Sequence, residues 1–293
     1  MTVAVGYLVG KSGRSSLHLA VEAARVLQTS LVVVTGVPKP WMTPSPARID
    51  AEYAAWAKQL GADSQHEAQR CLDQIADGLE ISYKQVANRT AGEGLVEAAE
   101  EIGAEVLVVG SSADGALGQV VLGSTSGWLL HSSPVPVAIS PRGYRGARSG
   151  KLTRITCAYS GTPESVHVVE RVAALTARLD VAMRVVSFAV RGRTMFPPEV
   201  GLHAEDSLLE AWATQLREML AKLKTDGIIG EDVALEVITG NGWDEALDAT
   251  EWEDGELLTL GSTSRRSLKG VFLGSHGAKI IRHSPVPVLV LPS

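Results

Sequence analysis

The chain has 293 residues and a formal net charge of −6, with acidic and basic residues mixed along its length. No basic patch is present, which argues against nucleic-acid binding, and no apolar run is long enough to span a membrane. Cys71 and Cys157 lie far apart, so we expect two reduced thiols and neither a disulfide nor a zinc site. The N-terminal segment lacks the basic start of a secretion signal, and we therefore expect a cytoplasmic protein.

The first half alternates between apolar strands and amphipathic helices. The apolar run Val3–Val9 is typical of a buried parallel strand, and the following helix is expected to take Ser15 or Ser16 as its N-cap. Gly103 is expected to end a later helix, as a C-terminal glycine does. In chain order we predict a strand at 3–9, a helix from 15, a strand at 31–37, a proline-rich loop at 38–48, a helix at 50–79, a strand at 81–87, a helix at 91–103 and a strand at 105–110.

The second half repeats this plan after a segment rich in Gly, Arg and Ser that has no periodicity. We predict a first domain at residues 1–141, a linker at 142–152 and a second domain at 153–293. Five strands and four helices in each half, in alternation, predict an α/β fold with a doubly wound parallel sheet and helices on both faces. In such sheets ligands lie at the carboxyl ends of the strands where the winding switches, here between the first and fourth strands.

One stretch occurs twice and anchors this interpretation. GSSADGALGQVVLGSTSGWLLHSSPVPVAIS starts at Gly110, and GSTSRRSLKGVFLGSHGAKIIRHSPVPVLVLP starts at Gly261. In each copy a Gly-Ser pair follows thirteen residues after the first glycine, and Pro-Val-Pro-Val begins eleven residues later. A fixed spacing repeated at a distance of about 150 residues is the mark of a duplicated domain.

Each copy combines a glycine turn after a buried strand with the start of a helix. Ser124 and Ser275 are placed as helix N-caps, and the exposed amides of such a loop suit an anion such as phosphate. The spacing alone is equally compatible with glycines that serve only the turn and caps that serve only the helix.

The order of strand, glycine motif, helix and Pro-Val-Pro-Val strand resembles the universal stress protein family in its tandem two-domain form, over essentially the whole chain. The resemblance implies two Rossmann-like domains of the adenine nucleotide alpha hydrolase type, each with a five-stranded parallel sheet. Nucleotide-binding members carry Gly-x2-Gly-x9-Gly-Ser/Thr, whose glycines and hydroxyl hold phosphates. They also carry an Asp at the end of the first strand, near the adenosine.

This sequence departs from the family motif in both halves. The middle glycine is Ala113 in the first copy and Ser264 in the second, and an alignment of the halves through Ser16 and Ser165 places Lys11 and Ser160 at the Asp position. We expect this change to weaken adenosine recognition and to leave a cation near a phosphate in the first half. The alternative is that Lys11 is an ordinary solvated loop residue.

The second copy carries more positive charge between its glycines, with Arg265, Arg266 and Lys269. Because guanidinium groups can grip phosphate with two hydrogen bonds, we expect the second half to be the better site for ATP or AMP, with Mg²⁺ arriving only with the nucleotide. A solvated basic loop is an equally open interpretation. The candidate binding residues are Lys11, Gly110, Ala113, Gly123, Ser124, Thr125, Ser160, Gly261, Ser264, Arg265, Gly274 and Ser275.

No catalytic motif is present: there is no nucleophile elbow, no set of metal ligands and no Cys/His pairing. We therefore expect a non-catalytic stress or signalling module that acts through partner contacts or self-association and responds to an adenine nucleotide. The alternative is an ATP-binding family member with slow hydrolysis. Since exposed sheet edges are a liability, Val135–Ser140 and Val286–Leu291 are expected to pair around a pseudo-two-fold axis, and tryptophan-bearing long helices to support a homodimer.

Overall fold

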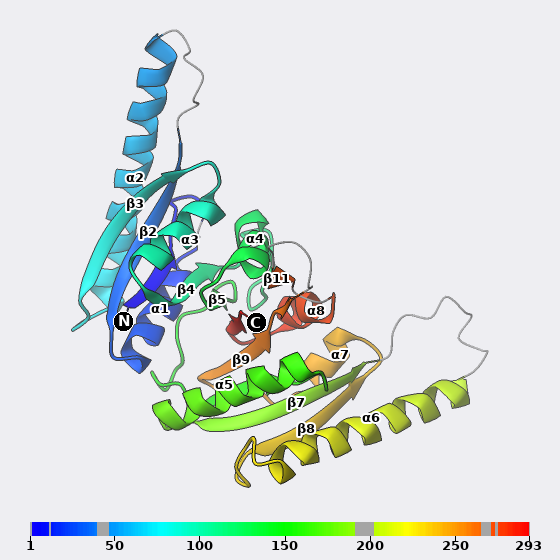
Figure 1. Cartoon of the computed structure of the whole chain (residues 1–293). Coiled ribbons are helices and arrows are strands. Elements are labelled where there is room, and N and C mark those ends of the chain that lie inside the picture. The colour runs from blue at the N-terminus through cyan, green and yellow to red at the C-terminus, as the bar shows by residue number, and fades with distance from the viewer. Residues whose placement is uncertain are drawn as a thin grey trace.

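The computed structural model describes residues 2–11, 13–39, 47–190, 202–264, 271–272 and 275–292. Ten strands form one continuous sheet in the order β3-β2-β1-β4-β5-β12-β9-β6-β7-β8, with one half of the chain on each side of its centre (Figure 1). The strands of the first half are β1 (Thr2–Gly6), β2 (Ser30–Pro38), β3 (Ile81–Asn88), β4 (Ala104–Gly110) and β5 (Val137–Ser140). Those of the second half are β6 (Arg154–Ala158), β7 (Ala182–Val190), β8 (Ala234–Gly240), β9 (Glu256–Gly261) and β12 (Val288–Leu291).

All neighbouring strands within each half are parallel, as predicted. The winding switches between β1 and β4 in the first half and between β6 and β9 in the second, so the predicted α/β fold and its switch points are confirmed. The helices are α1 (Ser15–Val26), α2 (Ala47–Ile75), α3 (Ala91–Glu101), α4 (Ser124–Ser132), α5 (Pro163–Leu179), α6 (Leu202–Thr225), α7 (Trp243–Asp248) and α8 (Ser275–His283).

The halves join through β5 and β12, the two strands that follow Pro-Val-Pro. They pair antiparallel, with Val137 opposite Val290 and Ile139 opposite Val288, which confirms the predicted pairing of the edge strands. Since the strands of the two halves consequently point in opposite directions, the two switch points open at opposite edges of the sheet.

Each face of the sheet is covered by four helices, and the apolar core on each face is continuous from one half to the other. Leu17 of α1, Leu72 of α2, Val169 of α5 and Leu220 of α6 belong to one core cluster. Helices α3, α4, α7 and α8 cover the other face. A fully buried leucine contributes roughly 1.5–3 kcal/mol, so this shared burial helps to hold the halves together alongside the backbone pairing.

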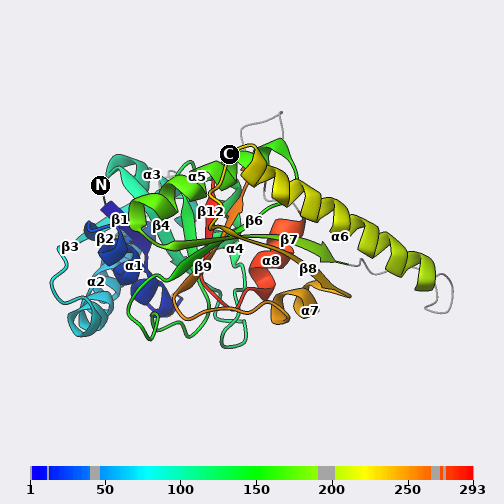
Figure 2. The ribbon, with the colours of Figure 1, turned by 90° about the horizontal axis from the view of Figure 1, so that it is seen from below.

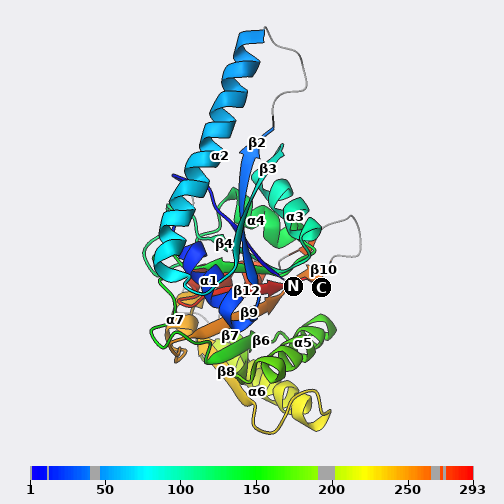
Figure 3. The same cartoon turned by 90° about the vertical axis from the view of Figure 1, so that its left-hand side faces the viewer.

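The two long helices extend beyond the sheet. Helix α2 rises past the ends of the strands in Figures 1 and 3, and α6 extends away from the sheet in Figures 1 and 2. Trp56 on α2 and Trp212 on α6 are 51% and 40% exposed. No helix among the described residues is long and apolar enough to cross a membrane.

Several predicted details of the elements are wrong at their ends. The first strand stops at Gly6. Arg14 is the N-cap of α1, so Ser15 and Ser16 are the first two residues of the helix and neither caps it. The Ser15 hydroxyl instead accepts a hydrogen bond from the Gly143 N–H at 3.0 Å. Ser124 is the first residue of α4 and its N-cap is Gly123. Gly103 does follow α3 in the left-handed conformation, with φ of 61°, as expected. A short antiparallel pair, β10 (Thr263–Ser264) with β11 (Val271–Phe272), was not predicted.

The segment proposed as a linker is bonded to both halves. The Tyr144 hydroxyl donates to Glu22 of α1 at 2.5 Å, and the backbone N–H groups of Arg148 and Ser149 donate to the Asp254 carboxylate at 3.0 and 2.9 Å. These hydrogen bonds lower the pKa of Asp254. The connection is therefore held in place as a strap and does not behave as a free tether.

Candidate functional site

A hollow of about 390 Å³ lies at the switch point of the first half. Its lining comes from the ends of β1, β2 and β4, the loop after β4 and the first turn of α4. The structure brings together all six first-half residues that the sequence singled out: Lys11, Gly110, Ala113, Gly123, Ser124 and Thr125.

Neither Gly110 nor Gly123, the two motif glycines at this hollow, is required by the fold. Gly110 and Gly123 do not have positive φ angles, and Gly123 has a φ of −79°. A Cβ added at Gly110 would approach Ser16 no closer than 3.7 Å, and one at Gly123 would approach Ser112 no closer than 3.7 Å, both ordinary contacts. Because an added Cβ fits at either position, what the glycines provide is bare backbone facing the hollow.

The start of α4 offers unpaired donors to this hollow. The first hydrogen bond within the helix runs from the Gly127 N–H to the Gly123 carbonyl at 2.9 Å, so the amides of Ser124, Thr125 and Ser126 precede the helical ladder. The Gly123 N–H itself is satisfied by the Ser126 hydroxyl at 2.9 Å. Together with the positive end of the helix dipole, this geometry suits an anion.

The loop between β4 and α4 is held closed by its own hydrogen bonds. The Ser112 N–H donates to the Val121 carbonyl at 2.8 Å, and the Val121 N–H donates to the Ser111 hydroxyl at 2.7 Å. Further along, the Arg142 N–H donates to the Gln119 carbonyl at 2.9 Å. The loop is thus pre-organised, which reduces the entropic cost of ordering it around a ligand.

Tyr7 and Lys11, which follow β1 in the chain, also line the hollow. Lys11 is exposed and supplies the positive charge. Burial and the neighbouring Glu67 carboxylate raise the pKa of Tyr7 to about 12, so its phenol stays protonated at neutral pH and can only act as an uncharged hydrogen-bonding group.

The structure corrects the alignment that equated Lys11 with Ser160. Tyr7 and Tyr159 occupy equivalent places. The Tyr7 N–H donates to the Val34 carbonyl of β2, and the Tyr159 N–H donates to the Val186 carbonyl of β7. Gln28 and Asp180, which follow α1 and α5, have φ angles of 52° and 53°. Their separation along the sequence equals that of Tyr7 and Tyr159, so the two pairs define one alignment of the halves. Ser160 is therefore the counterpart of Leu8, and Lys11 is the counterpart of Pro163, because α5 begins earlier than α1.

The second half has a hollow of about 420 Å³ at its own switch point. Ser160 and Gly261 line it, but the other predicted residues are only partly described. Ser264 lies in β10 and Ser275 begins α8, with backbone alone described for both. Arg265 and Gly274 lie outside the described residues.

Aromatic side chains line this second hollow, which the sequence interpretation missed. Phe188 stands in β7 at the place that Gly36 occupies in β2. Its ring centroid is 5.8 Å from that of Trp243, which in turn is 5.5 Å from His276. The sequence does contain this difference, since Phe188 replaces Gly36 in the equivalent strand. However, the two residues can be matched only once the register of the strands is known.

Gly261 also differs in kind from its counterpart Gly110. A Cβ at Gly261 would lie 2.3 Å from Cγ2 of Val168, which no real Cβ contact tolerates. In the second half the glycine is therefore required by helix–strand packing, whereas in the first half it is not. Among the described residues, no group of three or more potential ligands could hold a metal ion.

Comparison with known proteins agrees with this architecture. Residues 2–141 and 151–292 match the model of the Universal stress protein family. The chain belongs to that family. A universal stress protein of Mycobacterium tuberculosis is 58% identical over 292 residues and covers 100% of both chains. Another universal stress protein, from Mycolicibacterium smegmatis, is 28% identical over 143 residues, which is 48% of this chain and 99% of that protein.

Solved universal stress protein structures share the tandem fold. One from Archaeoglobus fulgidus aligns with a TM-score of 0.64 at 17% identity, covering 99% of this chain and 98% of its own. A putative universal stress protein from Pseudomonas aeruginosa aligns with a TM-score of 0.57 at 16% identity, covering 99% and 92%. At these identities the likeness concerns the fold alone.

Proposed function

We propose that this universal stress protein is a non-catalytic, nucleotide-responsive module whose first half binds an adenine nucleotide. Its phosphates would lie against the loop of Gly110 and Gly123 and the first turn of α4, with Lys11 as the nearby cation. Binding would then alter contacts with a partner or with a second copy of the chain. The proposal extends the family assignment and rests on the geometry of the first hollow.

The observation that carries the proposal is the contrast between the glycines. Gly110 and Gly123 face a hollow without any conformational or packing need for glycine, while Gly261 is required by Val168. Glycine loses more backbone entropy on folding than any other residue. Where glycine serves no packing purpose, close approach of a ligand is the best explanation for its presence. The positive charge of Arg265 favours nucleotide binding by the second half instead. The experiment below therefore tests both halves.

Slow or absent turnover agrees with the composition of the first hollow. Among the described residues that line it, none carries a carboxylate or an imidazole that could activate a water molecule. Lys11 and the hydroxyls can position phosphate, but none of them is a carboxylate or an imidazole that would act as a general base. Hydrolysis of ATP is the alternative function and would have to depend on groups supplied with the ligand.

The test is titration of the full chain with ATP and AMP by calorimetry, with Gly123→Ala as the decisive variant. Its new Cβ makes only ordinary contacts, so folding is retained, but it occupies the approach to the loop. We expect affinity to fall about ten-fold or more, which corresponds to about 1.4 kcal/mol. Gly127→Ala on the same helix is the matched control, because nothing lies within 4 Å of its added Cβ and it does not line the hollow.

Two outcomes would refute the first-half assignment. Equal affinity in the wild type and in Gly123→Ala, combined with a loss in Ser160→Ala, would move the site to the second half. No binding of either nucleotide to the wild type would leave a pure interaction module. Measuring released phosphate in the same samples separates binding from hydrolysis.

Self-association is part of the proposal. Trp56 and Trp212 are exposed on helices that extend beyond the sheet, and large exposed aromatic side chains are enriched at protein interfaces. Light scattering at two concentrations, with and without ATP, would detect a homodimer and its response to nucleotide. A mass equal to one chain under all conditions would exclude this part.

A further inference from the structure

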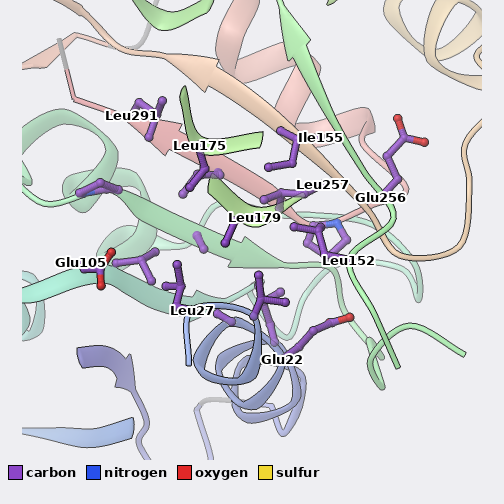
Figure 4. Close-up of a pocket in the computed structure, with 18 of the residues that line it drawn as sticks. Glu22, Leu27, Glu105, Leu152, Ile155, Leu175, Leu179, Glu256, Leu257 and Leu291 are labelled. Carbon is purple, nitrogen blue, oxygen red and sulfur yellow. The ribbon is translucent and has the colours of Figure 1, made fainter. Parts of the chain in front are cut away.

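An apolar groove of about 430 Å³ lies over the junction of the two halves, away from both switch points. Its floor includes Pro136, which precedes β5, Ala138 of β5 and Leu289 of β12. Its walls are α1 and α5: Leu27 lies on one side and Leu175 and Leu179 on the other, as Figure 4 shows. These wall residues are only partly buried, so the groove presents apolar surface to solvent.

The pseudo-two-fold axis gives the groove two equivalent ends, but their residues differ. Leu19 of α1 corresponds to Arg171 of α5, and Val26 corresponds to Arg178. Each pair is separated along the sequence by the same number of residues as Gln28 and Asp180. One end therefore carries two guanidinium groups where the other carries two aliphatic side chains. A groove of this kind is polarised from a cationic end to an apolar end.

Both arginines are attached to the same edge of the sheet. Arg178 donates to the Glu105 carboxylate at the start of β4 at 3.2 Å, and Arg171 donates to the Pro292 carbonyl just beyond β12. The antiparallel register of β5 and β12 brings the start of β4 and the end of β12 to one edge. Figure 4 shows Glu105 and Glu256 at opposite ends of the groove.

Two of the three carboxylates of the lining, Glu22 and Glu256, are engaged by groups other than Arg171 and Arg178. Glu256 is bound by Arg154 and Arg184, and Glu22 accepts from Tyr144 and from the Ala147 N–H. Only Glu105 meets a groove arginine, in a pair whose arginine side chain is 49% exposed. Arg171 has no ion pair with a described acidic side chain, so its guanidinium retains donors for an anion at the groove.

We propose that this groove binds a free fatty acid of medium length, with its carboxylate between Arg171 and Arg178 and its alkyl chain along the leucines toward Leu152 and Leu257. The volume lies in the range of small-molecule sites, roughly 300–1,000 Å³. Ala138, standing where the symmetric position has Leu289, leaves room on the floor of the groove. The site is distinct from the nucleotide hollows and does not depend on their function.

The experiment titrates the full chain with laurate, and in parallel with dodecanol, by calorimetry. We expect saturable laurate binding at one site per chain and weaker binding of dodecanol. Replacing both arginines, Arg171→Gln with Arg178→Gln, should weaken laurate about ten-fold or more while leaving dodecanol unchanged, because only laurate presents a charge. Ala174→Trp, at an exposed lining position on α5, should abolish binding of both probes by filling the groove.

Arg217→Gln on α6, exposed and outside the groove, is the matched control and should bind laurate like the wild type. Thermal unfolding of each variant checks that it is folded. The proposal is overturned by the absence of saturable laurate binding, or by unchanged affinity in the double arginine variant. It is likewise overturned if Ala174→Trp converts a dimer to a monomer without any laurate effect, since the groove is then covered by a second chain.

Discussion

The buried carboxylate of Glu256 offers the sharpest test of how the second half is stabilised. Its side chain is 0% exposed and meets Arg154 and Arg184, each at 2.8 Å. It also accepts from the Glu253 N–H at 2.8 Å and from the Thr156 hydroxyl. Burial alone would raise the pKa of Glu256, but the hydrogen bonds from Arg154, Glu253 and Thr156 and the charge of Arg184 outweigh it and lower that pKa.

Replacing Glu256 by Gln leaves two guanidinium groups beside a neutral amide. Breaking a buried ion pair costs about 3–5 kcal/mol. Arg154 and Arg184 retain the exposed carboxylates of Glu253 and Glu236, which are 55% and 43% exposed, so we expect the lower end of that range. At about 2–4 °C per kcal/mol, the midpoint of thermal unfolding should fall by roughly 6–12 °C.

Glu105→Gln is the matched control, since Glu105 and Glu256 both lie five residues before the glycine that ends their strand. Glu105 is 22% exposed and pairs only with the half-exposed Arg178, so its loss should cost no more than about 1 kcal/mol. Calorimetric unfolding of the three proteins measures the difference. Equal shifts for the two variants would show that the buried network adds nothing beyond a surface pair.

The same network predicts a pH dependence. Because the pKa of Glu256 is lower in the folded than in the unfolded chain, its stabilisation is present above the unfolded value and is lost as pH falls through the folded value. Wild-type stability should therefore decline below about pH 5 more steeply than that of Glu256→Gln. Parallel curves for the two proteins would contradict the assignment.

Two further outcomes follow from the glycines and the thiols. Gly261→Ala should destabilise the fold by about 1–3 kcal/mol because its Cβ collides with Val168, whereas Gly110→Ala should cost under about 1 kcal/mol; denaturant unfolding compares them. Burial raises the pKa of Cys157 to about 12 and also raises that of Cys71, so neither thiol should react with a thiol reagent at pH 8 until the protein unfolds; rapid labelling of the native chain would disprove this.

The repeated motif made the fold predictable. Its two spacings fix a strand, a turn, a helix and a final strand twice over, and the edge-strand argument then pairs Val137 with Val290. Local spacing works well here because strand ends and helix starts are determined by neighbouring residues. The residues of the first hollow were found for the same reason, since Gly110 and Ser124 lie on either side of one loop.

What the sequence did not reveal depends on contacts between distant segments. The match of Ser16 with Ser165 followed similar letters, yet strand register makes Ser16 the counterpart of Val168. Likewise, the Ser15 hydroxyl serves Gly143 and does not cap its helix, because the strap passes over α1. The aromatic wall, the buried ion network and the polarised groove all arise where separate strands or helices meet, which periodicity cannot show.

Fusion through β5 and β12 changes what the two copies must conserve. A homodimer built on the same pairing would present an identical residue to itself at every position, so each substitution would be made twice. In one polypeptide each half meets its partner at high effective concentration, and a substitution in one half leaves the other half unchanged. That freedom allows the second half to carry Phe188 at its hollow and the carboxylate–guanidinium cluster around Glu256, while the first half has Gly36 and Glu105 at the equivalent positions.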